Sequence, residues 1–257
     1  MMSEFSLVGH NAIVVGGARG LCLEMLRALA AAGANVGIVD VLEEQAEAAA
    51  RQATAEFGVQ ALVQVADVTR EDEIDRAFAG IEARLGSIDV LISGAGIAQY
   101  MAAAEMPLAD WRRIIEVNLT GMFICAQAAG RRMVARRRGS IILIASMSGS
   151  IVNHPQQQAA YNVSKAGVIM LAKSLAMEWA PYGVRVNSMS PGYIRTAMTA
   201  KVVEEEPELF KAWNSLIPVG KMGTPADLRG LAVYLASDAS GYMTGSDLVI
   251  DGGYTCW

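Results

Sequence analysis

The 257-residue sequence contains only three cysteines, Cys22, Cys125 and Cys256. They are odd in number and far apart, so they provide neither a disulfide framework nor the close spacing of metal ligands. We therefore expect no disulfide and no metal site. Free thiols suit a reducing compartment, and the expected location is the cytoplasm.

Long apolar stretches and an excess of positive charge are also lacking. The apolar runs are far shorter than the roughly 18 residues of a membrane span, and residues 1–15 lack the pattern of a secretory signal. The net charge is −5, whereas nucleic-acid-binding proteins are usually basic. The basic run at residues 131–138 falls at the end of an expected helix, where cations complement the helix dipole. We expect neither a membrane nor a nucleic acid as a partner.

Apolar residues make up 53% of the chain and charged residues 18%, which supplies a large core and excludes a disordered chain. Short β-rich runs alternate with helical stretches throughout. The expected strands are residues 12–15, 35–40, 61–67, 89–93, 140–146, 184–190 and 247–251. The expected helices are residues 21–32, 43–57, 70–85, about 107–138 and 159–179.

Apolar strands that alternate with helices predict a parallel sheet covered on both faces. The predicted fold is α/β: a doubly wound Rossmann fold with a seven-stranded parallel sheet in a three-layer α/β/α arrangement. We expect a single domain over residues 1–257, because no linker or repeat interrupts the pattern. Residues of about 193–225 contain three prolines and an acidic run, and are either a substrate lid or a helical pair at the domain edge.

A glycine-rich turn, VVGGARGLCLE, follows the first expected strand and opens the first helix. Gly16 and Gly20 allow a tight turn and a close approach of a pyrophosphate, and the helix start near Leu21 offers free N–H groups. Asp40 ends the second strand, where a carboxylate can bind ribose hydroxyls and repel the 2′-phosphate of NADP. The turn therefore predicts NAD, although Arg19 could bind that phosphate and leaves NADP possible.

Tyr161 and Lys165 are four residues apart, so they lie one turn apart on one face of a helix. A neighbouring ammonium stabilises a phenolate, and lowering the tyrosine pKa by about 3 units requires roughly 4 kcal/mol. Ser146 ends the fifth strand at the carboxyl edge of the sheet, and Asn118 lies in a helix that flanks the same crevice. Pro191–Gly192 and Thr196 follow the sixth strand at that edge.

These motifs, in this order, resemble the short-chain dehydrogenase/reductase superfamily over nearly the whole chain. The resemblance rests on the glycine turn, Asp67–Val68, Ala95–Gly96, Asn118, Ser146, Tyr161 with Lys165, Pro191–Gly192, and the tail DLVIDGGYTCW.

The resemblance implies hydride transfer at a site where Asn118, Ser146, Tyr161 and Lys165 are catalytic. Tyr161 would exchange the hydroxyl proton, Lys165 would lower its pKa and bind the nicotinamide ribose, and Ser146 would polarise the carbonyl. Asn118 would hold a helix bend and a proton-relaying water. The cofactor-binding residues would be Gly16, Arg19, Gly20, Leu21, Asp40, Asp67, Val68, Ser93, Ala95, Gly96, Tyr161, Lys165, Pro191, Gly192, Ile194 and Thr196.

The sequence departs from the family pattern in four places. Val15 replaces a threonine, Cys22 replaces a glycine, and Ser93–Gly94 replaces a pair of asparagines, which puts cofactor affinity in doubt. Ser148 lies 13 residues before Tyr161, the usual interval, and Ser146 lies 15 before it. We favour Ser146 as the serine that polarises the carbonyl and treat Ser148 as a substrate contact, but Ser148 stays an alternative.

The chain looks most like polyol dehydrogenases and ketose reductases. Ser148, Asn153 and His154 are polar residues near Tyr161 and suit a polyhydroxylated substrate, for which Ser146, Ser148, Asn153 and Tyr161 are the expected contacts. A 3-oxoacyl or general ketone reductase is the alternative, and a dinucleotide sensor without turnover belongs to a different class. Long helices with few charges, which pair between subunits in this family, predict a homotetramer.

Overall fold

The computed structural model describes residues 2–196, 199 and 206–256. In this part of the chain seven parallel strands form one sheet, in the order β3-β2-β1-β4-β5-β6-β7. The strands are β1 (Asn11–Val15), β2 (Asn35–Asp40), β3 (Ala61–Val65), β4 (Val90–Ser93), β5 (Gly139–Ile144), β6 (Val184–Pro191) and β7 (Asp247–Ile250). This confirms the predicted doubly wound α/β fold.

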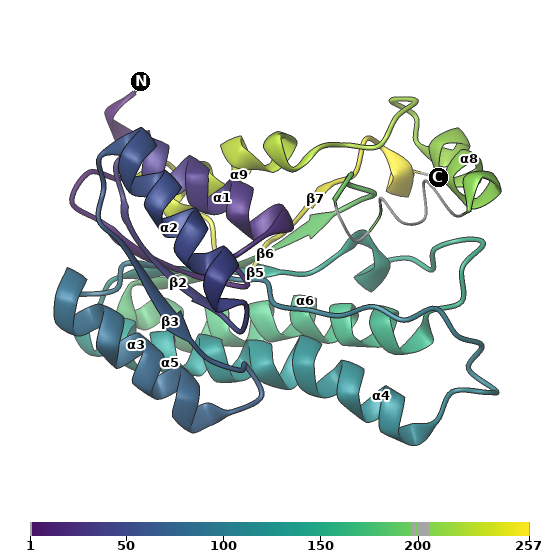
Figure 1. Cartoon of the computed structure of the whole chain (residues 1–257), viewed down its shortest axis with the longest axis horizontal. Coiled ribbons are helices and arrows are strands. Elements are labelled where there is room, and N and C mark those ends of the chain that lie inside the picture. Colours follow the sequence, from purple (N-terminus) through teal and green to yellow (C-terminus); the bar gives the residue numbers. More distant parts are fainter. Residues whose placement is uncertain (1, 197–198, 200–205, 257) are drawn as a thin grey trace.

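Helices cover both faces of the sheet and produce three layers (Figure 1). One core lies between the sheet and helices α1 (Gly20–Ala31), α2 (Glu43–Phe57) and α9 (Arg229–Ala236). The second core lies between the other face and helices α3 (Glu71–Leu85), α5 (Gly121–Arg136) and α6 (Ala159–Trp179). Every residue of β1 is buried because both faces of the central strands are covered.

The expected helix over about 107–138 is three pieces. Helix α4 (Leu108–Ile115) continues into a π-helical turn, Glu116–Thr120, and then into α5. A π-turn slips the hydrogen-bond ladder from i→i+4 to i→i+5, and such turns are frequent at functional sites. This one contains Asn118.

The sheet register aligns the carboxyl ends of the central strands. Val15 of β1 pairs with Ser93 of β4, Ser93 pairs with Leu143 of β5, and Leu143 pairs with Ser188 of β6. The segments that follow β1, β4 and β5 therefore leave the sheet at one edge, where open α/β sheets bind ligands.

The third core packs over that edge. Helix α8 (Pro207–Leu216) brings Trp213 onto Tyr193, with ring centroids 4.4 Å apart and nearly parallel planes. Met147, Ile217, Met222 and Tyr254 complete the buried cluster. The segment at about 193–225 thus packs against the serine loop, and its acidic run lies partly outside the described residues.

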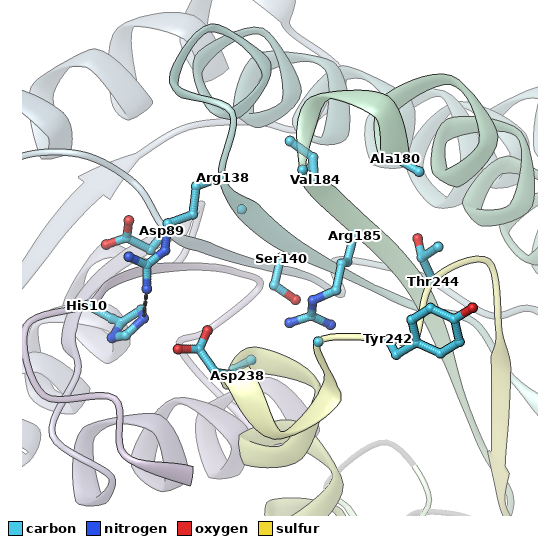
Figure 2. A pocket seen from close by; sticks show the side chains of 14 residues that line it. His10, Asp89, Arg138, Ser140, Ala180, Val184, Arg185, Asp238, Tyr242 and Thr244 are labelled. Atoms are coloured by element: carbon cyan, nitrogen blue, oxygen red, sulfur yellow. Dashed lines mark hydrogen bonds between the residues drawn. The ribbon is translucent and has the colours of Figure 1, made fainter. Parts of the chain in front are cut away.

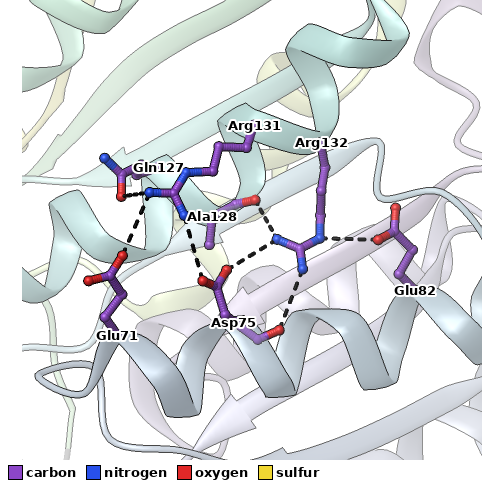
Figure 3. Close-up of polar contacts among 7 residues, drawn as sticks. All are labelled: Glu71, Asp75, Glu82, Gln127, Ala128, Arg131 and Arg132. Carbon is purple, nitrogen blue, oxygen red and sulfur yellow. Dashed lines mark hydrogen bonds and ion pairs between the residues drawn. The ribbon is translucent and has the colours of Figure 1, made fainter.

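Two arginines near the end of α5 form ion pairs with acidic residues of the neighbouring helix α3 (Figure 3). Arg131 lies 3.6 Å from both Glu71 and Asp75, and Arg132 lies 3.5 Å from Asp75 and 3.1 Å from Glu82. These residues of the basic run therefore join two helices.

Membrane spans and clustered metal ligands are both absent from the described residues. None of the helices there is both long and apolar enough for a membrane crossing. No cluster of three or more His, Cys, Asp or Glu side chains there could hold a metal ion.

Candidate active site

The expected serine, tyrosine and lysine converge where β5 ends. Ser146 follows β5 and begins the short 3₁₀ turn Met147–Gly149, and Tyr161 and Lys165 lie on the first two turns of α6. The Ser146 hydroxyl lies close enough to the Tyr161 phenol to oppose the rise in its pKa that burial causes. The chain thus places a hydroxyl donor, a phenol and an ammonium in one buried corner.

Lys165 is the buried cation of this corner. It is 4% exposed, and its Nζ donates a hydrogen bond of 2.8 Å to the Ile144 carbonyl. Burial lowers the pKa of Lys165 to about 8. An ammonium carries three hydrogens, so a single carbonyl acceptor among the described residues leaves donors for the hydroxyls of a nicotinamide ribose. This buried cation fits a dinucleotide cofactor.

In the protein alone the pKa of the Tyr161 phenol lies above its ordinary value. Burial raises its pKa, and the hydrogen bond with Ser146 opposes the rise. The Lys165 Nζ lies 5.7 Å from the centre of the Tyr161 ring and is not among the causes of the shift. The expected lowering of this pKa by Lys165 together with a bound nicotinamide ring stays a prediction.

Ser146 and Ser148 lie beside each other, with their Oγ atoms 3.1 Å apart. The Ser148 backbone N–H also donates to Ser146 Oγ at 3.1 Å, so Ser146 caps the turn as well as facing Tyr161. Ser146 is the serine that contacts the tyrosine, which supports it as the group next to the reacting oxygen.

Asn118 connects three parts of the site. Its amide nitrogen donates to the Ile97 carbonyl at 2.9 Å and to Ser164 Oγ at 3.1 Å, and its oxygen accepts from the Ile97 N–H at 2.8 Å. Asn118 is fully buried in the π-turn. Its side chain therefore ties the loop after β4 to α6, while the expected proton-relaying water stays a prediction.

The glycine turn has the geometry that a pyrophosphate needs. Gly16 and Gly20 have φ values of 77° and 66°, which favour glycine, and a Cβ on Gly16 would lie 2.8 Å from the Ala95 nitrogen. Leu21 is in the first turn of α1, whose N-terminal N–H groups face this edge. Asp40 accepts hydrogen bonds from the backbone N–H groups of Ala18 and Leu42, at 3.0 and 3.1 Å.

Two of the departures from the family pattern form a single contact. A Cβ on Gly94 would lie 2.3 Å from Cys22 Sγ, so the cysteine occupies the space that a side chain at position 94 would need. Cys22 is buried, and burial raises its pKa to about 12, so it is a neutral packing group. The residues at these two positions therefore pack against each other, and their effect on cofactor affinity stays a prediction.

Three expected cofactor residues have side chains held by the protein itself. The Asp67 carboxylate accepts from the Thr69 N–H and hydroxyl, both at 2.9 Å. Val68 is buried, and a Cβ on Gly121 would lie 2.7 Å from it. Ser93 hydrogen-bonds Cys125 on the α5 side of the sheet. The Ser93 hydroxyl and the Val68 side chain point into the fold, and the expected contacts of all three residues with the cofactor stay predictions.

The segment after β6 is positioned by β7 and by a short turn. Gly192 donates to the Ile250 carbonyl at 3.0 Å, and a Cβ on Gly192 would meet Asp251 at 2.6 Å. Ile194 is buried in the first core and bridges to Gly223. The expected carboxamide ligand Thr196 donates through its N–H to Thr199 Oγ1 at 2.8 Å. Pro191 ends β6 at this edge.

The structure adds residues that the sequence analysis missed. Gln158 donates from Nε2 to Ser148 Oγ at 3.2 Å. Burial raises the pKa of Tyr100, and the charge of a nearby Tyr161 phenolate adds to the rise. Asn153, an expected substrate contact, is 3% exposed and bonded at both ends of its amide, to Tyr193 and Gln158. In the protein alone Asn153 thus forms part of the wall behind the serines, and its contact with substrate stays a prediction.

A second hollow lies at the opposite edge of the sheet. This cavity has a volume of about 550 Å³. Its lining includes His10, Arg138 and Arg185 (Figure 2). It also borders Gly139 and Val184, the first residues of β5 and β6. Arg185 donates to backbone carbonyls at 2.9 and 3.1 Å. Because ligands of open α/β sheets bind at the carboxyl edge, this cavity is not the active site.

Comparison with known proteins agrees with the site. Residues 16–255 match the sequence family described as "Enoyl-(Acyl carrier protein) reductase". The chain belongs to the short-chain dehydrogenase/reductase family. It is an NAD(P)-dependent oxidoreductase that acts on CH–OH groups. The resemblance inferred from the motifs is confirmed.

Several proteins of known name or structure align with this dehydrogenase over nearly its whole length. It is 43% identical over 254 residues to galactitol 2-dehydrogenase (L-tagatose-forming) of Cereibacter sphaeroides, with 98% of each chain covered. It is 41% identical over 258 residues to the NADP-dependent mannitol dehydrogenase of Hypocrea jecorina, with 99% and 96% covered. The crystal structure of gox2181 is 42% identical, with a TM-score of 0.97 and coverage of 100% and 99%.

The lowered pKa of Lys165 predicts that this residue destabilises the fold at neutral pH. Folding lowers the pKa from 10.5 to about 8. Between these values the unfolded chain holds the proton that the folded chain has lost, so the free energy of unfolding rises with pH. Below pH 8 Lys165 is protonated in both states, so the full free-energy cost of burying its charge applies. Lys165→Met should therefore stabilise the dehydrogenase at pH 7 by roughly 1–3 kcal/mol, after allowance for the lost bond to Ile144.

Urea denaturation without added nucleotide, at pH 7 and at pH 10.5, measures this effect. The gain should shrink at the higher pH, where the penalty on the folded state has largely gone. Lys173→Met, at an exposed position of the same helix, is the matched control and should change stability little at either pH. Equal gains for the two variants, or a gain that grows with pH, would contradict the prediction.

Proposed function

We propose that this dehydrogenase interconverts a polyol and its ketose with NAD as the cofactor. The observation that carries the proposal is the full-length similarity, at 43% identity, to an enzyme named galactitol 2-dehydrogenase. The D-arabinitol 2-dehydrogenase of Scheffersomyces stipitis is 42% identical over 272 residues. The hydroxyl and amide groups of Ser148 and Gln158 behind Ser146 suit a polyhydroxylated substrate.

The proposed roles follow from the position of each group. A bound nicotinamide supplies or accepts the hydride. Ser146 would donate a hydrogen bond to the reacting oxygen, and Tyr161 would exchange a proton with it as general acid or base. Lys165 would bind the ribose and keep a positive charge beside the phenolate. Asn118 would hold the loop after β4 and α6 at the correct separation.

NAD is proposed over NADP because of Asp40. Its carboxylate sits at the carboxyl edge, held by the Ala18 and Leu42 N–H groups, and each oxygen keeps a lone pair for a ribose hydroxyl. A 2′-phosphate there would meet a fixed negative charge. Arg19 is exposed at the start of α1 and offers the opposing attraction. We also propose a cytoplasmic location, since all three cysteines are free.

Initial rates with both cofactors test the proposal. The panel is galactitol, D-arabinitol and mannitol as alcohols, with a ketose and a 3-oxoacyl thioester as substrates for reduction. We expect kcat/KM to be at least about 10-fold higher with NAD than with NADP, and higher for a polyol pair than for the thioester. Asp40→Ala should reduce the cofactor ratio. A preference for NADP contradicts the role of Asp40, and turnover of the thioester alone contradicts the substrate class.

The proposed assembly is a homotetramer. On α6, Val163, Met170 and Met177 recur every seven residues and are 49%, 60% and 74% exposed. Phe123 on the adjacent α5 is 40% exposed. An apolar stripe of this kind on two neighbouring helices is typical of a surface that pairs with a second copy of the chain.

Met170→Glu should weaken the assembly, because it places a charge in the centre of the stripe. Sedimentation should find the wild type at four times the 27.2 kDa of one chain and the variant at a smaller mass. Arg51→Glu, at an exposed site on α2, is the control and should stay tetrameric. A wild type that sediments as a monomer at micromolar concentration would refute the tetramer.

A further inference from the structure

A continuous chain of side-chain hydrogen bonds connects helix α8 to the active-site serines. Trp213 Nε1 donates to Gln156 Oε1 at 3.0 Å, and Gln156 Nε2 donates to the Tyr193 hydroxyl at 2.6 Å. Asn153 Nδ2 donates to the same hydroxyl at 3.2 Å. Gln158 Nε2 donates to Asn153 Oδ1 and to Ser148 Oγ, both at 3.2 Å. The groups come from three segments distant in sequence.

The direction of these bonds is set at the tryptophan. An indole N–H can only donate, so Gln156 must present its oxygen to Trp213 and its nitrogen to Tyr193. The Tyr193 oxygen accepts from Gln156 and also from the Asn153 nitrogen. Asn153 is then left with its oxygen towards Gln158. Trp213 thus fixes the Gln156 amide, and in the observed arrangement Asn153 donates to Tyr193 and accepts from Gln158.

Gln158 is the last amide of this chain and is 6% exposed. Its nitrogen faces two amide oxygens, Asn162 Oδ1 at 2.8 Å and Asn153 Oδ1 at 3.2 Å, in addition to Ser148 Oγ. Two carbonyl oxygens on one side exclude the flipped amide, which would set oxygen against oxygen. Ser148 therefore always meets a donor at Gln158, and it accepts there.

This constraint decides where the serine hydrogens can go. Ser148 cannot give its hydrogen to Gln158, so that hydrogen is available to Ser146, 3.1 Å away. In the protein alone Ser146 donates to Ser148. A substrate oxygen next to Ser146 offers a second acceptor, and the two hydroxyls can then exchange roles. Ser146 accepts from the Ser148 N–H and O–H and donates its own hydrogen to the substrate.

We propose that Gln158 is a positioning residue that keeps Ser148 an acceptor on its outer side, so that Ser146 can donate its hydrogen to the substrate oxygen. Helix α8 takes part in this through Trp213, which fixes the orientation of the Gln156 amide beside Tyr193. The proposal builds on the secondary alcohol chemistry of the proposed function and holds for any alcohol that the enzyme oxidises. It also assigns separate tasks to the two serines: Ser146 contacts substrate, and Ser148 orients Ser146.

Gln158→Glu reverses the constraint at nearly the same side-chain volume, and the Asn153 and Asn162 amides that face it must turn their nitrogens towards the new carboxylate. A carboxylate only accepts, so it would hold the Ser148 hydrogen and leave Ser148 an acceptor for Ser146. The Ser146 hydrogen would then be drawn away from the substrate. We expect kcat at pH 8.5 to fall about 10- to 100-fold, which is less than the loss caused by removing an oxyanion-hole donor. The NADH dissociation constant should change less than about threefold.

Two comparisons separate this mechanism from a general effect of charge or damage to the fold. In Ser148→Ala the Ser146 oxygen keeps the backbone N–H of residue 148, so kcat should fall less than about fivefold. In that background, adding Gln158→Glu should lower kcat by less than about threefold, because the serine that transmits its effect is gone. Gln157→Glu, one residue away, adds the same charge as a matched control and should leave kcat near wild type.

The pH profile is the further readout. The carboxyl group of the Gln158→Glu variant, once protonated, can donate as the glutamine amide does. The ratio of wild-type to Gln158→Glu kcat should therefore decrease as pH falls from about 8.5 to about 5.5. An equal loss with and without Ser148, or a ratio independent of pH, would overturn the proposal. Rates are measured on whichever secondary alcohol of the panel the wild type oxidises, so failure of the polyol assignment stays distinct from failure of this one.

Discussion

The site depends on an ammonium buried at the edge of the sheet beside a backbone carbonyl. Lys165 donates to the Ile144 oxygen, and burial lowers its pKa to about 8. A cation in that position is costly for the fold and useful for catalysis, because its remaining donors and its charge are available to a ligand. The parallel sheet supplies the place for this group: β5 ends at Ile144, beside the first turns of α6.

Tyr161 shows why the ammonium alone is insufficient. Its pKa is raised by burial, and the Ser146 hydrogen bond is the effect that opposes the rise. The orientation of the Ser146 hydroxyl therefore affects the pKa of the phenol. In our proposal Ser148, Gln158 and Asn153 determine which oxygen accepts the Ser146 hydrogen, and in this way they influence proton transfer.

Much of this could be predicted from the sequence. Apolar strands alternating with helices led to the doubly wound sheet, and the ends of those strands led to Ser146 and Asp40. The spacing of Tyr161 and Lys165 placed both on one helix face. What the sequence did not reveal depends on contacts between distant segments. Cys22 and Gly94 look like two independent losses until the sulfur is found in the space beside the glycine. The π-turn at Asn118 has no periodicity signal, and Gln158 matters only through Asn153, Tyr193 and Trp213.

The most direct measurement on the central claim is the oxidation rate of Tyr161→Phe on the alcohol that the wild type prefers. The phenylalanine keeps the ring and removes the phenolic oxygen that exchanges a proton with substrate. The account predicts that kcat falls by about 10³-fold or more while the NADH dissociation constant stays within about threefold of wild type. Oxidation that continues at a rate close to that of the wild type would contradict it.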